Sequence, residues 1–307
     1  MTQIRKGVIT AAGRGTRQYP ASKTVQKELF PLVDIDGFTK PTVQILAEEL
    51  FASGLEEVCI IANSANIDPM RRHFLEPAPA SLRGKDWADA QTQSLAQMAE
   101  KLTFVVQETQ DGYGHAVYQA RTFAAGEPVL ITLGDHVYLS DTDTRCTRQV
   151  LDAFAKYDAS ITSVSYASEA ELHRFGTLSG PLLSGTTPPV YEIKALVEKP
   201  TVDYARAHLQ APGVPDGQYL VHFGIHAFTP TIFDCLKYLI DNNQRQHGEI
   251  QLTSAQILLM ERERYLACEV AGVRCDMGVP EGLVETQIAL ALRGPFATQA
   301  RAILGNL

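Results

Sequence analysis

The sequence predicts an α/β fold with a mixed, mostly parallel central sheet flanked by helices. Short apolar runs rich in β-branched residues alternate with helix-like segments along the first half of the chain. Such runs are typical of buried strands, and their alternation with helices is typical of parallel sheets. The chain has 307 residues and is 45% hydrophobic, which is enough for a substantial core.

The first half supplies the clearest elements. Five apolar runs are expected to form strands, at residues 7–12, 58–63, 102–107, 128–135 and 159–166. A helix is expected at 41–54, because Pro41 suits a first turn and Gly54 suits a C-terminal cap. A second helix is expected at 142–158.

After about residue 167 the pattern becomes mixed. A strand-like segment covers 219–228, and helices are expected near 230–241, 250–264 and 282–292. We expect these strands to join the same sheet and these helices to cover it. The chain shows no internal repeat, low-complexity tract or long linker.

Composition excludes several classes of protein. The net charge of -8 argues against a general nucleic-acid binder, which needs a basic surface. No stretch is long and apolar enough for a membrane span, and the first residues do not resemble a signal peptide. We therefore expect a cytoplasmic protein without a membrane or nucleic-acid partner. The five cysteines are scattered and form no CxxC, so neither a disulfide framework nor a cysteine zinc site is indicated.

The segment ITAAGRGTRQYPASKTVQKELFPLVD, residues 9–34, follows the first expected strand and crowds glycines and cations together. Ligands of open α/β sheets bind at the carboxyl ends of strands. Gly13 and Gly15 let backbone N–H groups approach phosphate oxygens, while Arg17 and Lys27 add positive charge. A triphosphate fits this loop better than a dinucleotide, although a tight turn with solvated cations stays open as the alternative.

Two familiar phosphate loops are excluded by spacing. The dinucleotide fingerprint GxGxxG fails because Gln18 stands where its third glycine should be. The form GxxxxGK[ST] fails because Ser22 precedes Lys23.

The stretch GRGTRQYPASKTVQKELFPLVD resembles the signature of the sugar-phosphate nucleotidyltransferases, in particular the bacterial UTP:glucose-1-phosphate uridylyltransferases, or UDP-glucose pyrophosphorylases. Further motifs follow in family order: VVQETQDGYGHAVYQA, LGDHV, RFGTL, LVEKP, GEIQLTSA and CDMGVPEGL. The resemblance implies a Rossmann-like nucleotidyltransferase fold and one domain over residues 1–307, with a nucleotide-binding half to about residue 166 and a sugar-binding and C-terminal part at about 167–307. It implies an enzyme that condenses UTP with glucose 1-phosphate and releases pyrophosphate, by Mg²⁺-assisted in-line displacement at the α-phosphorus.

The resemblance also implies residue roles. Catalytic roles fall to four residues, Arg17, Lys27, Asp135 and Lys199. Nucleotide binding falls to Ala11, Ala12, Gly13, Gly15, Gln107 and Gly112. Sugar-phosphate binding falls to Gly176, Glu198 and Lys199. Binding of the Mg²⁺ cofactor is assigned to Asp135 and Asp276.

The chemistry demands such residues independently of any resemblance. Two anions must meet when a sugar phosphate attacks a triphosphate, and negative charge then builds on the departing pyrophosphate. Cations offset that charge, and Mg²⁺ prefers carboxylate and phosphate oxygens. An amide such as that of Gln107 can donate to one edge atom of uracil or thymine and accept from the imide N–H, which cytosine lacks.

Each assignment has a structural alternative. Asp135 could be a turn or cap residue, Lys199 a surface charge and Gln107 an edge residue, and only their joint order favours the site. His222 and His226 lie four apart, hence on one face of a strand, but no third ligand for a metal is evident.

The sequence departs from the family pattern at three places. Gln26 replaces a usual proline, residues 35–39 look like a short insertion, and LVHFGIH stands where glucose-specific relatives typically carry a Gly-Arg-Tyr type sequence. The last departure leaves the sugar open. The alternatives are a related transferase using dTTP or another sugar 1-phosphate, and a non-catalytic sugar-nucleotide sensor. We also expect a homo-oligomer, either a dimer or a tetramer.

Overall fold

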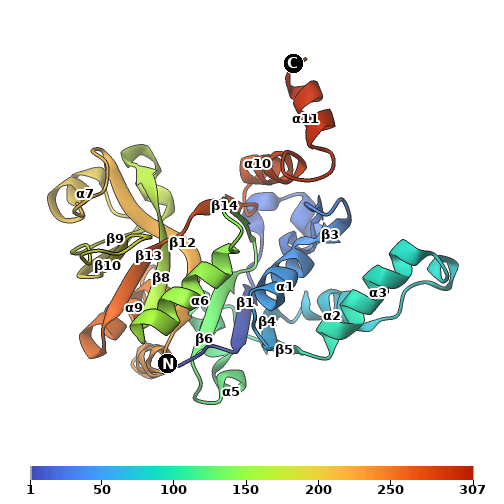
Figure 1. Cartoon of the computed structure of the whole chain (residues 1–307). Helices are drawn as coiled ribbons and strands as arrows, with labels where there is room; N and C mark the ends of the chain where they lie inside the picture. Colours follow the sequence, from blue (N-terminus) through green and yellow to red (C-terminus); the bar gives the residue numbers. More distant parts are fainter. Residues whose placement is uncertain (1, 307) are drawn as a thin grey trace.

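Buried apolar strands form the centre of the molecule in the computed structural model, which describes residues 2–306 (Figure 1). The strands of the large sheet are β1 (Lys6–Ala11), β4 (Glu57–Asn63), β5 (Leu102–Gln107), β6 (Val129–Leu133), β8 (Ser160–Ser168), β9 (Gly176–Ser179), β10 (Val190–Glu192), β11 (Ala195–Glu198), β12 (Gln218–Phe228) and β13 (Tyr265–Glu269). Two small ribbons pair β2 (Pro31–Val33) with β3 (Thr39–Pro41), and β7 (His136–Ser140) with β14 (Gly272–Asp276).

The large sheet runs in the order β10-β13-β8-β12-β6-β1-β4-β5, and the β9–β11 hairpin attaches to β12. Within residues 2–306, seven of its ten strands run in one direction, and β10, β11 and β12 oppose them. The sheet is therefore mixed and mostly parallel, as the sequence predicts. Strands from both sequence halves belong to it, because β12 lies between β6 and β8.

Helices cover both faces of this sheet (Figure 1). The α-helices are α1 (Thr42–Ala52), α2 (Ile67–Leu75), α3 (Asp86–Ala99), α4 (Tyr113–Tyr118), α5 (Arg121–Ala124), α6 (Cys146–Tyr157), α7 (Val202–His208), α8 (Thr231–Asp241), α9 (Leu252–Arg262), α10 (Pro280–Ala291) and α11 (Ala297–Leu304). Short 3-10 turns cover Thr16–Gln18, Ala21–Lys23, Lys27–Leu29, Ala80–Leu82 and Glu169–Arg174. No helix within residues 2–306 is long and apolar enough to cross a membrane.

Strand alternation divides the core into two faces. In β1, Ile9 packs in a cluster with Leu46 of α1 and Phe154 of α6, whereas its neighbour Val8 packs in a second cluster with Leu236 of α8. All five side chains are almost fully buried. Consecutive residues of a strand point to opposite faces, so a strand covered on both sides reads as a continuous apolar run.

The predicted strands and helices are confirmed, with small differences at their ends. The run at 128–135 stops as a strand at Leu133, because the chain turns there into β7. Helix α6 begins at Cys146 rather than near 142, since the hydroxyl of Thr142 bonds the backbone N–H and carbonyl of Thr144 and holds a turn. Pro41 ends β3 and caps α1 from outside instead of sitting in its first turn.

Candidate active site

A cavity of about 500 Å³ opens where β1, β5 and β6 end. Six of the residues predicted from the sequence line it: Ala12, Gly13, Lys27, Gln107, Gly112 and Asp135. Ala11 lies just inside, fully buried at the end of β1. The position agrees with the rule that open α/β sheets bind ligands at the carboxyl ends of their strands.

The glycine loop folds over the side chain of Lys27. Gly15 has a φ of 62°, a left-handed conformation, and a Cβ there would lie 3.3 Å from Cβ of Ser22. A Cβ on Gly13 would lie 3.7 Å from Cε of Lys27. Small residues at both places let the loop lie against the lysine and keep the backbone open toward the cavity.

Gln107 is buried at the end of β5, and its amide is oriented by its neighbours. The amide nitrogen donates to the carbonyl of Gly112 over 3.2 Å and to Nδ1 of His115 over 2.9 Å. Both donor hydrogens are therefore used, and the carbonyl Oε1 makes no hydrogen bond within residues 2–306. This differs from the sequence-based expectation, because Gln107 offers a base an acceptor and not a donor.

Gly112 lies in the segment after β5, at a position where a side chain does not fit. Its φ is 103°, and a Cβ would lie 2.6 Å from the carbonyl oxygen of Ile250 and 2.8 Å from Cβ of Glu249. The close approach of these two segments brings Glu249 into the cavity wall. That contact joins segments far apart in the chain and was not predicted from the sequence.

Lys27 lies between two buried carboxylates. Its Nζ contacts Oδ2 of Asp135 and lies 3.1 Å from Oε1 of Glu28. Burial works against the ammonium charge, but the two carboxylates raise the pKa of Lys27 above its ordinary value. Burial also raises the pKa of Glu28 to about 7, despite the charge of Lys27. For Asp135, burial is outweighed by the charges of Lys27 and His136, and its pKa is lowered.

Asp135 and Asp276 meet around Gly278. Asp276 ends β14, whose pairing with β7 places it opposite His136, the residue after Asp135. Nε2 of His136 lies 3.9 Å from Oδ1 of Asp135 and 3.6 Å from Oδ1 of Asp276. A Cβ on Gly278 would lie 2.4 Å from Oδ2 of Asp135 and 3.0 Å from Oδ1 of Asp276. The glycine therefore leaves a space that faces both carboxylates.

Arg17 also borders this space. Its NH2 would lie 3.1 Å from a Cβ on Gly278, the same point that the two carboxylates approach. The side chain is exposed and makes no ion pair within residues 2–306. Arg17 therefore keeps its donors available to a ligand.

The predicted sugar-phosphate residues lie together on the β9–β11 hairpin. Glu198 of β11 pairs with Gly176 of β9, and Oε2 of Glu198 accepts a hydrogen bond from Oγ1 of Thr253 over 2.8 Å. Lys199 has a φ of 49°, and its Nζ lies 3.9 Å from Oε1 of Glu198 with the side chain 58% exposed. Left-handed backbone at a lysine is strained, as is often found at functional sites.

The predicted residues thus form three groups. The nucleotide loop and the carboxylates are joined by the contact between Lys27 and Asp135. Sequence analysis missed three members of these groups, Glu28, His136 and Gly278. Their closeness in the sequence to predicted site residues could have indicated them, because each lies within two residues of one. Nothing in the sequence shows which of the neighbouring side chains points into the site.

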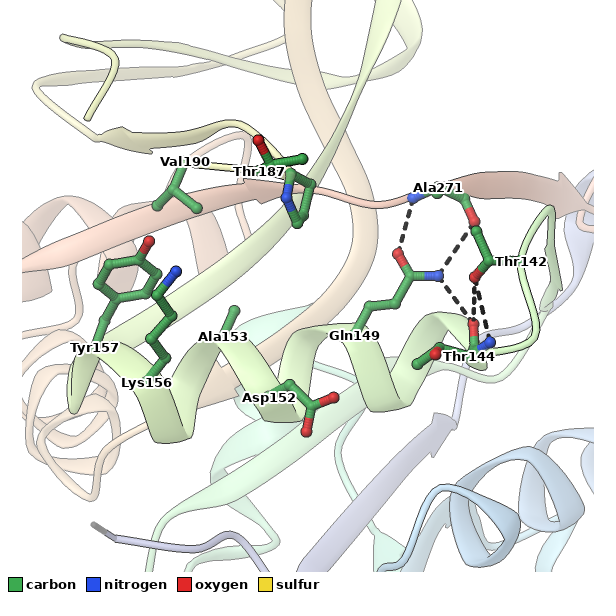
Figure 2. Close-up of a pocket in the computed structure, with 11 residues that line it drawn as sticks. Thr142, Thr144, Gln149, Asp152, Ala153, Lys156, Tyr157, Thr187, Val190 and Ala271 are labelled. Atoms are coloured by element: carbon green, nitrogen blue, oxygen red, sulfur yellow. Dashed lines mark hydrogen bonds between the residues drawn. The ribbon is translucent and has the colours of Figure 1, made fainter. Parts of the chain in front are cut away.

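A separate cavity of about 540 Å³ lies between α6 and the loop before β10 (Figure 2). It contains none of the predicted site residues. The amide of Gln149 in its wall is already paired, since it bonds the backbone of Ala271 and the carbonyl of Thr144. Size alone therefore does not identify the active site.

The chain is similar to known proteins over nearly its whole length. The chain is 30% identical over 302 residues to a UTP-glucose-1-phosphate uridylyltransferase of Staphylococcus epidermidis, covering 97% of this chain and 96% of that protein. It is 33% identical over 298 residues to a UTP-glucose-1-phosphate uridylyltransferase of Bacillus subtilis strain 168, covering 95% and 93%. A crystal structure of UDP-glucose pyrophosphorylase complexed with UDP-glucose matches with a TM-score of 0.74 and 28% identity, covering 93% of this chain and 98% of that one.

The chain also matches a protein-family profile. The profile described as Nucleotidyl transferase covers residues 6–291, which include the glycine loop, both carboxylates and the β9–β11 hairpin. With the cavity, the cations and the carboxylates arranged as above, the chain belongs to the nucleotidyl transferase family.

Proposed function

We propose that this protein condenses UTP with glucose 1-phosphate to give UDP-glucose and pyrophosphate. The observation that carries the proposal is one cavity lined by Gln107 and by the paired Lys27 and Asp135. A base acceptor and a phosphate-binding cation are thereby placed along a single nucleotide-sized space. The near-full-length similarity to two UTP-glucose-1-phosphate uridylyltransferases supports these substrates.

The reaction needs no protein nucleophile. An oxygen of the sugar phosphate forms a bond to the α-phosphorus of UTP, and the bond from that phosphorus to the bridging oxygen of pyrophosphate breaks. Arg17, which has no ion pair within residues 2–306, stabilises the charge on the departing pyrophosphate. Lys27 exchanges its contact with Asp135 for one with a phosphate oxygen, because the two anions compete for the same ammonium group.

Asp135 and Asp276 are the residues that would hold Mg²⁺. One ligand atom from each of Asp135, His136 and Asp276 lies within 4.8 Å of the others. The pKa of Asp276 is lowered, since His136 and the N–H of Gly278 outweigh burial, so both carboxylates are ionised at neutral pH. The bound ion would neutralise charge on the phosphates. Chelation should abolish pyrophosphate release, and added Mg²⁺ should restore it.

The base is selected through Gln107. Its free carbonyl Oε1 accepts a hydrogen bond from the imide N–H that uracil and thymine carry and cytosine lacks. Loss of such a bond is a stronger basis for rejection than an added methyl group. UTP is therefore preferred, and dTTP is its nearest competitor.

The decisive experiment measures pyrophosphate release over a grid of nucleoside triphosphates and sugar 1-phosphates. UTP with glucose 1-phosphate should be fastest, dTTP should follow, and CTP, ATP and GTP should be far slower. Gln107→Glu should damage UTP use, because it removes the amide that bonds Gly112 and adds a charge. A preference for ATP or GTP would contradict the assignment of the base.

Two sequence-based expectations stay predictions. The cytoplasmic location follows only from the sequence, and so does the homo-oligomer, dimer or tetramer. Light scattering on the purified protein measures the oligomeric state directly.

A further inference from the structure

His222 is a half-buried histidine beside the predicted sugar residues. Its Nε2 is buried and makes no hydrogen bond within residues 2–306. A Cβ on Gly176 would lie 2.7 Å from Cδ2 and 3.4 Å from Nε2 of His222, and 3.1 Å from Oε2 of Glu198. The imidazole edge and the carboxylate therefore converge on the same face of Gly176. A buried polar atom without a partner in this position points to a ligand.

The position of the ring is set by an irregularity in β12. The pairing of β12 with β8 shifts register between His222 and His226, and Gly224 in between has a φ of 102°. Such a bulge re-aims side chains. Here it brings both histidines to Thr162, whose Oγ1 lies 2.9 Å from Nδ1 of His222 and 2.8 Å from Nδ1 of His226.

These contacts fix the proton on the ring of His222. A hydroxyl has one proton, and Oγ1 of Thr162 also lies 3.4 Å from the carbonyl oxygen of Ser163, so at most one of the two Nδ1 atoms accepts from Thr162 and any other donates to it. The amide nitrogen of Gln256, which can only donate, lies 3.4 Å from Nδ1 of His226. His226 therefore accepts at Nδ1, Thr162 donates to it, and Nδ1–H of His222 donates to Thr162. Nε2 of His222 is left as an unprotonated acceptor.

The ring is also neutral. Burial and the charge of Arg274 lower the pKa of His222 to about 4. Arg274 itself donates to the backbone carbonyl of His222 over 2.5 Å and lies over the ring of Phe175, 4.2 Å from its centroid. The acceptor at Nε2 therefore persists at neutral pH on a fixed segment of backbone.

We propose that His222 determines sugar specificity, with its Nε2 accepting a hydrogen bond from one hydroxyl of the hexose 1-phosphate while Glu198 accepts from the neighbouring hydroxyl. This proposal rests on the proposed function. Two adjacent acceptors fit a vicinal diol with both hydroxyls free. A sugar that is deoxygenated or O-alkylated at either place leaves a buried acceptor unpaired and is rejected.

The test combines variants of His222 with glucose 1-phosphate and its monodeoxy analogues. The wild type should lose roughly 10- to 100-fold in kcat/KM with the analogue that lacks the hydroxyl read by His222. In His222→Leu, glucose 1-phosphate should lose a similar factor, and the penalty for that one analogue should disappear. The KM for UTP should stay unchanged. The exposed His173→Ala serves as the control and should behave as wild type.

The outcomes separate this proposal from the proposed function. If the wild type uses no sugar 1-phosphate with UTP, the proposed function fails. If the wild type is active and His222→Leu loses as much kcat/KM with every monodeoxy analogue as the wild type does, the proposed role of His222 is wrong.

A second measurement holds even where His222→Leu does not fold. In ¹⁵N-labelled wild type, the Nε2 resonance of His222 should show an unprotonated nitrogen that shifts when glucose 1-phosphate is added. A protonated Nε2, or one that does not shift in an active enzyme, also overturns the proposal.

Discussion

Lys27 shares its charge between two buried acids that respond in opposite ways. The pKa of Asp135 is lowered, whereas burial raises that of Glu28 to about 7. Asp135 is therefore ionised at neutral pH, and Glu28 titrates there. Glu28 is a buried acid that the proposed reaction does not use directly, and its proton governs how tightly Lys27 is held.

This arrangement predicts a pH-dependent contribution to stability. Because the pKa of Glu28 is raised from its ordinary 4.5 to about 7, the folded state keeps a proton that the unfolded state loses between these values. The contribution of Glu28 to the free energy of unfolding must then fall as pH rises through that window. Glu28→Gln has no such group to titrate. Its free energy of unfolding, relative to that of the wild type, should therefore rise by up to about 3 kcal/mol between pH 4.5 and 7.5.

Urea unfolding of the metal-free protein at several pH values measures this difference. Glu100→Gln provides the control, because Glu100 is exposed and makes no ion pair within residues 2–306. Parallel pH profiles for Glu28→Gln and the wild type would show that Glu28 does not titrate near neutral pH.

The carboxylates give a second prediction at the residue scale. Asp135→Asn and Asp276→Asn each remove a charge from the space around Gly278 with little change in volume. Each should lower kcat by about 100-fold or more, which is typical when a charged contact to the transition state is lost. The exposed Asp203→Asn is the control, and thermal melting checks the fold. Wild-type turnover at low Mg²⁺ in either variant would remove that residue from the metal site.

At the scale of elements, the site depends on turns that approach one another closely. The segment after β5 meets the segment before α9 at Gly112, where a Cβ would lie 2.6 Å from the carbonyl of Ile250. The turn after β14 brings Gly278 against both carboxylates. Glycine is required at both places by contact, and at Gly112 also by its φ of 103°.

Two glycine variants separate contact from backbone strain. Gly112 and Gly248 both have positive φ, 103° and 83°, but a Cβ on Gly248 would meet nothing within 4 Å. Gly248→Ala should therefore cost about 1 kcal/mol of unfolding free energy from strain alone. Gly112→Ala should cost more and should raise the KM for UTP, because the wall of the nucleotide cavity must move. Equal effects of the two variants in urea unfolding and kinetics would contradict the close approach.

At the scale of the whole molecule, both sequence halves share one sheet. Strand β12 pairs with β6 on one side and with β8 on the other, and β13 adds to β8. Any opening between the halves would break a buried ladder of hydrogen bonds. We therefore keep the prediction of a single domain over residues 1–307, whose two parts near residue 166 unfold together.

Hydrogen exchange tests this prediction. Amides of β1 and β13 should lose protection with the same dependence on urea and the same opening free energy, because one cooperative transition exposes both strands. The exposed helix α11 should exchange much faster and mark local opening. If β13 opened at a lower free energy than β1, the C-terminal part would be a separate domain.

Much of the architecture could be predicted from the sequence for a local reason. A strand covered on both faces must be apolar throughout, so the runs that became β1, β4 and β6 are visible without any knowledge of their neighbours. The ribbon of β7 and β14 was not predicted, because its two strands are separated by more than a hundred residues.

The sequence by itself determined the order of strands and helices, the glycine loop at a strand end, and the residue types that phosphate chemistry needs. Only the tertiary structure decided that Gln107 presents an acceptor, that Lys27 is the ion-pair partner of Glu28 within residues 2–306, and that His222 faces Gly176. These facts depend on strand register, on the bulge in β12 and on contacts between distant segments. Local periodicity does not encode them, because a shift of one residue in register would turn each side chain to the opposite face.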